Sequence, residues 1–246
     1  MDVYNLIKNH RSIRKYKDID VCEDELRKII ECAIHAPSSI NGQQWGIVVI
    51  RDAETKKKIA ELSGGQVWVE KAPVFLLFVG DYSKAAVAVS NAGLDFENID
   101  SLEATMVMSV DVGIAFANAM NCAESLGFGI VPIGGIRRAP DEMISLLDLP
   151  QYVYPIVGMC IGVPDEDPMC KPRFPYDSMV HNEKYDSSKT KEQVEEYDGI
   201  VREYMLERTG GKESRTWSDT ISGTYSRVYF PRVNPSLKKQ GFENSK

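Results

Sequence analysis

Residues 74–80 (VFLLFVG) form an unbroken apolar run that restricts the fold more than any other segment. The run has the length of a strand and falls well short of the roughly 20 residues that a membrane-spanning helix needs. Apolar side chains at every position, rather than at alternate positions, indicate a strand that is covered on both faces. The sequence therefore predicts that 74–80 is a central strand of a sheet.

The rest of the chain is rich in helical patterns, with a few further strands between them. Helices are predicted over 24–34, 53–62, 102–126 and 190–208 and from Pro140, and strands over 46–51 and 152–163, the latter interrupted at Gly158. Asp20 and Glu23 resemble a capping box for the first helix, and the run Lys56–Lys58 is interpreted as the solvated face of the second. This order indicates an α+β or α/β fold, and the absence of GxGxxG after the first strand argues against a Rossmann dinucleotide site.

The predicted helix 102–126 is unusual because it contains many small side chains, among them Gly113, Ala115 and Ala119. Small side chains allow a second helix to approach closely, so this helix is expected at the centre of the fold or at a dimer interface. Residues 165–188 are irregular and proline-rich, and 216–246 are polar and aromatic and are expected to cover another surface. We expect 1–165 to form a core and 166–246 to continue the same domain.

Composition and charge argue against several classes of function. The net charge of −7 and the pI of about 5.2 argue against a nucleic-acid partner. The five cysteines and three histidines are scattered without CxxC or metal-ligand spacing, so neither a disulfide framework nor a metal site is expected. The N-terminus lacks the apolar segment of a signal peptide, and a cytoplasmic location away from membranes is expected.

Two clusters in the first 45 residues could carry chemistry. His10-Arg11-Ser12-Ile13-Arg14 gathers two guanidiniums, a hydroxyl and an imidazole, which are natural ligands of phosphate and of an electron-rich ring edge. Alternatively, it is a solvated basic patch. Residues 37–45 (PSSINGQQW) place hydroxyls and amides in a turn before a strand. An ordinary capped turn would look the same.

Two further clusters lie later in the chain. In 131–138 (VPIGGIRR), two adjacent glycines follow an apolar run, so that backbone amides can approach a ligand or adopt positive φ, unless the pair is merely a turn. In 171–175 (KPRFP), prolines stiffen an extended segment and fix the directions of Lys171 and Arg173. A rigid pair of cations suits a phosphate dianion, although a solvated loop is equally compatible.

Taken together and in this order, HRSIR, PSSxNxQ, PIGG and KPRxP resemble the nitroreductase family of FMN enzymes. The resemblance is strongest to the larger branch of NADPH-type oxygen-insensitive nitroreductases and NADPH–flavin oxidoreductases. Residues 64–66 (GGQ), 123–127 (AESLG) and 216–219 (TWSD) support that branch, whereas the Pro37 and Asn41 turn is closer to the smaller nitroreductases.

The resemblance implies an α+β three-layer sandwich with a central, mostly antiparallel sheet, helices on both faces and a C-terminal extension that embraces a partner subunit. It further implies a homodimer with FMN at the interface, and reduction of nitroaromatics, quinones or flavins by NAD(P)H in a ping-pong hydride transfer. The chemistry occurs at the flavin N5, and no catalytic residue of the protein is named.

Site residues follow from the same resemblance. His10, Ser12, Lys171 and Arg173 are expected to hold the FMN phosphate, Arg14 and Gln66 to face the pyrimidine edge of the ring, and Gly134 and Gly135 to place backbone amides near N5 and O4. Ser38, Ser39 and Asn41 are expected to reach the flavin of the partner chain. Arg11, Pro132 and Ile133 are also expected among the cofactor-binding residues. Arg208 and Lys212 are expected to bind the 2′-phosphate of NADPH, which favours NADPH over NADH. Basic residues near a helix C-terminus can instead complement the helix dipole.

Three other functions remain open at this point. One is a flavin reductase that passes reduced FMN to a partner enzyme. Another is a non-catalytic flavin or nucleotide sensor. The last is a purely structural oligomer built on the small-residue helix.

Overall fold

The computed structural model describes residues 2–246 and divides into two compact units. Unit 1 comprises the chain up to Pro168 together with Arg232–Lys246, and unit 2 comprises Met169–Pro231. The two units are described separately below.

A four-stranded sheet forms the centre of unit 1. Its strands are β1 (Trp45–Ile50), β2 (Val74–Asp81), β3 (Gly129–Ile133) and β4 (Val153–Gly162), in the order β1-β2-β4-β3, and each neighbouring pair is antiparallel. Residue Leu77 of β2 lies between Val48 of β1 and Gly158 of β4. The prediction that 74–80 is a central strand is confirmed.

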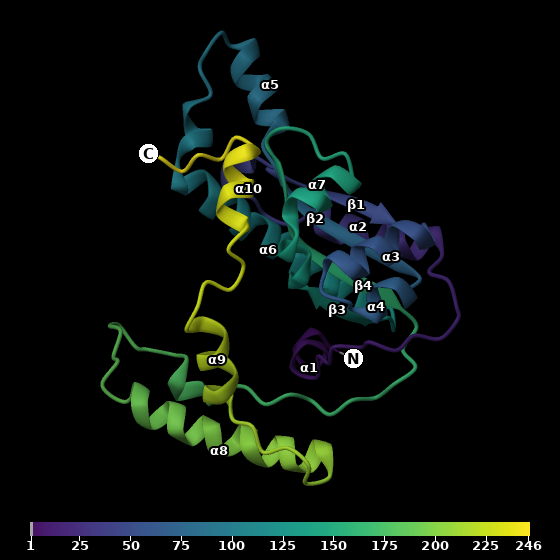
Figure 1. Ribbon diagram of the computed structural model, residues 1–246, viewed down its shortest axis with the longest axis vertical. Coiled ribbons are helices and arrows are strands. Elements are labelled where there is room, and N and C mark those ends of the chain that lie inside the picture. Colours follow the sequence, from purple (N-terminus) through teal and green to yellow (C-terminus); the bar gives the residue numbers. More distant parts are fainter. Residues whose placement is uncertain (1) are drawn as a thin grey trace. The chain divides into compact units, whose positions relative to one another are not determined.

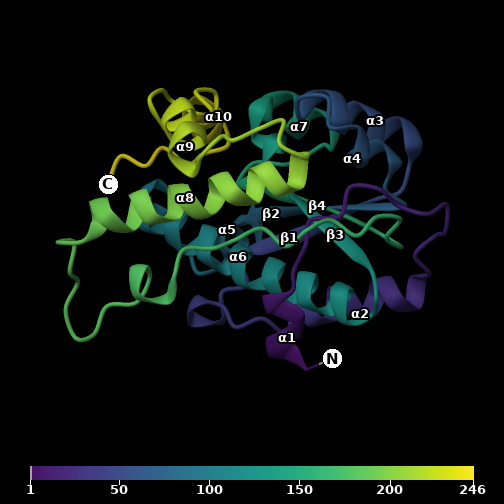
Figure 2. The ribbon, with the colours of Figure 1, turned by 90° about the horizontal axis from the view of Figure 1, so that it is seen from below.

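Helices cover both faces of this sheet (Figures 1 and 2). On one face lie α2 (Glu23–Ile34) and α6 (Leu102–Ser125), and on the other lie α3 (Ala53–Leu62), α4 (Val67–Lys71) and α7 (Pro140–Leu146). Successive residues of β2 face opposite layers, since Leu76 and Phe78 pack with α2 and α6 while Phe75 and Leu77 pack with α3 and α4. The α+β three-layer architecture is therefore confirmed.

The long helix α6 is the central helix of its layer. Its length of 24 residues, with a mean hydropathy of 1.3 over an 18-residue stretch, would also suit a membrane span by length and composition. Val112, Ala115 and Ala119 are buried in the core cluster that α6 shares with α2 and the sheet. Of the small residues predicted to allow close approach, Ala115 and Ala119 thus face α2 and the sheet, whereas Gly113 is exposed.

Shorter elements complete unit 1. They are α1 (Val3–Lys8), α5 (Ser83–Asn91), α10 (Val233–Lys239) and the 3-10 turns Ser39–Asn41, Glu97–Asp100 and Gly134–Arg138. Leu237 and Phe242 at the C-terminal end are buried against Tyr82 and Tyr154. The segment 232–246 therefore covers a surface of its own chain, and an embrace of a partner stays a prediction.

Unit 2 contains the 3-10 turn Tyr176–Ser178 and the helices α8 (Thr190–Thr209) and α9 (Trp217–Tyr225). Helix α8 ends at Gly210, which adopts the left-handed conformation with φ 61°, as the Gly210-Gly211 pair predicts. A capping box does occur here, where Thr216 and Asp219 begin α9.

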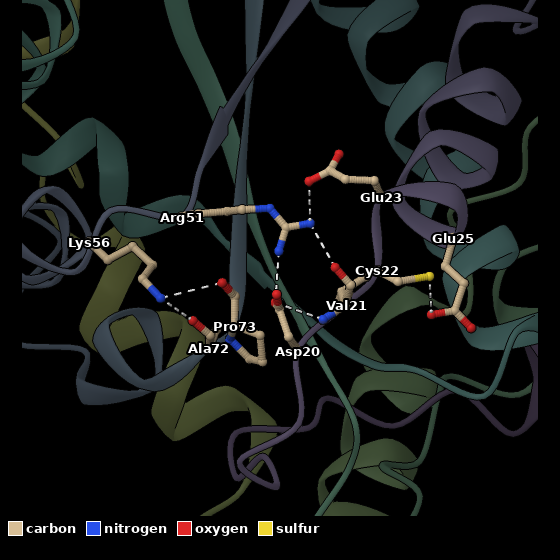
Figure 3. A network of polar contacts seen from close by, with 9 residues as sticks. All are labelled: Asp20, Val21, Cys22, Glu23, Glu25, Arg51, Lys56, Ala72 and Pro73. Atoms are coloured by element: carbon tan, nitrogen blue, oxygen red, sulfur yellow. Dashed lines mark hydrogen bonds and ion pairs between the residues drawn. The ribbon is translucent and has the colours of Figure 1, made fainter.

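Three local predictions in unit 1 are wrong. The N-cap of α2 is Cys22, and the Asp20 carboxylate instead accepts bonds from the Val21 amide and the Arg51 guanidinium (Figure 3). Lys56 does not lie on a solvated face, since it is buried and its Nζ donates to the Ala72 carbonyl at 2.6 Å. Local patterns do not reveal these distant partners.

Gly158 does not interrupt its strand either. Strand β4 runs through it from Val153 to Gly162. A Cβ at Gly158 would lie 2.2 Å from the Phe75 ring, so the glycine makes room for a large core side chain on the neighbouring strand.

Candidate functional site

The N-terminal HRSIR segment lies along the free edge of β3. Ser12 forms a parallel bridge with Ile130, and the Ile13 amide donates to the Ile130 carbonyl at 2.9 Å. Gly129 permits this approach, because a Cβ there would lie 2.7 Å from the Ile13 side chain. The segment is therefore held by its backbone, which leaves the polar side chains on either side of it available for other contacts.

Acidic residues that follow β4 bind the same segment. Glu166 Oε1 accepts from the backbone amides of Arg14 at 2.5 Å and Lys15 at 3.1 Å, and Asp167 forms an ion pair with Arg11. Arg11 is thus paired with Asp167, whereas the Arg14 side chain is exposed and its guanidinium lies 5.4 Å from the centre of the Trp68 ring. A cation held over an indole face has a restricted direction.

Gln66 and Gly135 meet beside the start of α4. The Gln66 side chain donates from Nε2 to the Ser63 carbonyl at 2.8 Å. A Cβ at Gly135 would lie 2.4 Å from that Nε2 and 2.6 Å from the Ser63 carbonyl oxygen. Gly134 and Gly135 both have negative φ, so at Gly135 the requirement is for close approach rather than for a left-handed backbone.

The loop 37–44 connects α2 with β1, and a buried carboxylate anchors it. Asp111 of α6 is 3% exposed, and its Oδ2 accepts from the Ser39 amide at 3.1 Å and from Gln44 Nε2 at 2.7 Å. Burial raises the pKa of Asp111, and the bond from Ser39 opposes that shift. This contact fixes both ends of the turn that carries Ser39 and Asn41.

The same loop has a strained backbone. Ile40, Asn41 and Gln43 have φ of 50°, 55° and 50°. A left-handed conformation is unfavourable for a β-branched residue, and the Ile40 side chain is 97% exposed, so packing of that side chain does not offset the cost. Such strain persists where surrounding contacts impose it, and here the contacts with Asp111 do so.

Lys171 and Arg173 lie in unit 2, in a segment held by aromatic residues. The Pro172 carbonyl accepts from the Tyr197 hydroxyl at 2.8 Å. The Phe174 ring stacks on Tyr197 at 3.9 Å and meets Trp217 edge-on at 5.1 Å. Lys171 and Arg173 are both exposed. The direction of this segment is thus fixed by α8 and α9 as well as by its prolines.

Arg208 and Lys212 lie at the C-terminal end of α8. Both side chains are exposed, and the Arg208 guanidinium lies 6.0 Å from the Tyr204 ring. Arg208 is in the last turn of the helix, where it also complements the helix dipole.

The structure brings several of the predicted residues together within unit 1. Arg14 lies over Trp68 in the first turn of α4, and Gln66 is the N-cap of the same helix. Gln66 also lies against Gly135. Pro132 and Ile133 form the end of β3, just before the two glycines. Ser38, Ser39 and Asn41 share the anchored loop, and His10 contacts Glu124. The supporting residues Trp68, Asp111, Glu166 and Tyr197 were not predicted. Only Asp111 carries a sequence signal, as the one charged residue between Glu103 and Glu124 in the apolar middle of α6.

Comparison with known proteins identifies the family. The nitroreductase family model matches residues 7–163, and the model of its C-terminal domain matches 171–245. The chain belongs to the nitroreductase family. The resemblance inferred from the four sequence motifs is thereby confirmed.

Individual relatives extend over the whole chain. An FMN reductase [NAD(P)H] of Bacillus subtilis (strain 168) is 44% identical over 100% of this chain and 99% of its own. The structure of NfrA2 from B. megaterium matches with a TM-score of 0.97, 44% identity and full coverage of both chains. An NADPH:FMN oxidoreductase from Vibrio harveyi, solved with NAD+, matches with a TM-score of 0.88 and 32% identity over 98% of each chain.

The residues present in unit 1 fit a flavin ring. Arg14 and Trp68 line a cavity of about 730 Å³, which lies in the size range of small-molecule and cofactor sites. Nearby, the buried Ser63 Oγ and Trp68 Nε1 have no hydrogen-bond partner within residues 2–246. The donors and the space together suit a planar ring with acceptors along one edge.

Proposed function

We propose that this protein is an FMN-dependent NAD(P)H oxidoreductase that reduces small oxidised acceptors in a ping-pong reaction. The observation that carries the proposal is the arrangement around the first turn of α4. There, Arg14, Gln66 and Gly135 come from three distant parts of the chain. Membership of the nitroreductase family supports the same conclusion.

Within this proposal the protein binds and orients the cofactor. When bound, FMN supplies the hydride chemistry at its N5 atom, so no general acid or nucleophile of the protein is required. Arg14 provides a fixed positive charge at the pyrimidine edge of the ring, which favours the reduced state. Gln66 donates along the same edge, and the backbone at Gly134 and Gly135 faces N5 and O4.

His10 and Ser12 of unit 1 are assigned to the FMN phosphate, and the family resemblance assigns Lys171 and Arg173 of unit 2 to a flavin phosphate as well. Arg11 was expected to bind the cofactor, but its ion pair with Asp167 favours a structural role. Ser38, Ser39 and Asn41 are assigned to the flavin of a partner chain, which makes the active protein a homodimer.

Anaerobic spectroscopy of the purified protein tests this function directly. We expect a yellow protein whose flavin absorption bleaches on addition of NADPH and returns when a quinone or a nitroaromatic is added. A bound flavin that NADPH does not bleach would instead favour the sensor. A colourless protein that does not take up added FMN would favour the structural oligomer.

The choice of acceptor has one specific alternative, a flavin reductase that releases reduced FMN to a second enzyme. This alternative is supported by the 44% identity of the chain with an FMN reductase [NAD(P)H]. Comparison of kcat/KM for free FMN with kcat/KM for a nitroaromatic and a quinone separates the two functions.

Replacement of Arg208 by alanine tests the preference for NADPH. We expect the KM for NADPH to rise about 10-fold, because a charge-assisted contact with the 2′-phosphate contributes about 1.5 kcal/mol or more. The KM for NADH should not change, since NADH lacks that phosphate. Steady-state kinetics with both donors gives the result, and Lys191→Ala at the other end of α8 serves as the control. Equal effects on both donors would remove the assigned role of Arg208.

A further inference from the structure

The His10 ring is largely buried, with its side chain 19% exposed. The residue follows α1, a helix of six residues none of which is buried. The ring contacts helix α6, where its Nδ1 lies 2.5 Å from Oε1 of Glu124. This contact ties His10 to a residue 114 positions away in the chain.

Glu124 is itself held rigidly. It lies in the last turn of α6, next to Ala123, which is fully buried in the core. The Glu124 side chain is 12% exposed and that of His10 is 19% exposed, so the pair is largely removed from water. A carboxylate in such surroundings needs a donor, and His10 Nδ1 provides it.

The geometry determines which ring nitrogen is left for a ligand. When Nδ1 carries the hydrogen that Glu124 accepts, Nε2 is the nitrogen that can contact another group. His10 and Glu124 border a cavity of about 220 Å³, several times the roughly 30 Å³ that one water molecule occupies. The other acids that line it, Glu166 and Asp167, already accept from Arg14, Lys15 and Arg11.

We infer that Glu124 is a positioning residue for the FMN phosphate and acts through His10. Its carboxylate accepts from Nδ1 and so holds the imidazole with Nε2 turned toward the phosphate. The inference rests on the proposed function, because it requires FMN to bind with its phosphate near His10. Riboflavin lacks the phosphate, so Glu124 should not affect its binding.

Flavin titrations of the apoprotein test this role. Kd values for FMN and for riboflavin are measured from flavin fluorescence with the wild type, Glu124→Ala, Glu124→Gln and His10→Ala. We expect Glu124→Ala to raise the Kd for FMN about 10-fold, as is typical when the carboxylate behind a ligating histidine is removed. Glu124→Gln should have a smaller effect, since its amide oxygen still accepts from Nδ1, and riboflavin binding should not change.

A double variant separates positioning from general support of the fold. If Glu124 acts through His10, adding Glu124→Ala to His10→Ala produces no further loss of FMN affinity. Glu103→Ala, an exposed glutamate in the first turn of the same helix, is the matched control and should bind both flavins normally. Melting temperatures of the apoproteins show whether each variant folds, and Glu124→Gln remains informative if Glu124→Ala does not.

The outcomes distinguish this inference from the proposed function. Equal losses for FMN and riboflavin, or losses that add in the double variant, would overturn the positioning role. So would normal FMN affinity in Glu124→Ala alongside weakened affinity in His10→Ala. If His10→Ala itself binds both flavins as the wild type does, the phosphate assignment fails, and the role of Glu124 fails with it.

Discussion

Replacement of both Lys171 and Arg173 by alanine is expected to give a folded but colourless protein. Each hydrogen bond to a charged group contributes about 1.5–3 kcal/mol, so loss of two phosphate contacts should weaken FMN binding by roughly 10²- to 10⁴-fold. Gel filtration followed by absorbance spectroscopy measures the flavin that remains bound, and a fluorescence titration of the apoprotein gives the Kd.

The control for this variant removes the same charge from the same unit. Lys189→Ala with Lys191→Ala, at the exposed start of α8, should retain its flavin. Arg173 also donates to the Lys171 and Pro172 carbonyls at 3.0 and 3.3 Å, so the melting temperature of the apoprotein must be compared as well. Full flavin occupancy in the Lys171 and Arg173 variant would contradict the assignment of both residues to the phosphate.

Asp111→Ala is expected to lower the free energy of unfolding by about 2–4 kcal/mol, because it leaves the Ser39 amide and the buried Gln44 side chain without their acceptor. The strained loop 38–43 should then relax away from its left-handed conformation. Urea denaturation followed by circular dichroism measures the stability. Flavin affinity should fall in addition, since Ser38, Ser39 and Asn41 would no longer be presented.

Asp111→Asn provides the informative comparison. The side-chain oxygen of an asparagine can still accept from the Ser39 amide. The Gln44 side-chain amide can rotate so that its oxygen accepts from the NH2 group of the asparagine. Most of the stability should therefore be retained. Asp95→Ala, which removes an exposed carboxylate, serves as the surface control. If Asp111→Ala were as stable as Asp95→Ala, the carboxylate would not be what imposes the strain.

The sequence by itself determined the local elements and their layers. The unbroken apolar run of β2 requires cover on two faces, and the structure provides it with α2 and α6 on one face and α3 and α4 on the other. Gly210 ends α8 because a left-handed residue is needed there. These features depend on neighbouring residues, and so they can be predicted without knowledge of distant contacts. The four motifs identified the family for the same reason, since each is a short continuous segment.

The tertiary structure alone decided which distant residues support the site. Asp111 is separated from Ser39 by 72 positions, Glu124 from His10 by 114, and Glu166 from Arg14 by 152. Lys56, interpreted from its neighbours as part of a solvated face, is buried because the carbonyls of Ala72 and Pro73 lie within its reach. Hydrogen bonds and burial depend on distance in space, and periodicity along the chain does not record that distance.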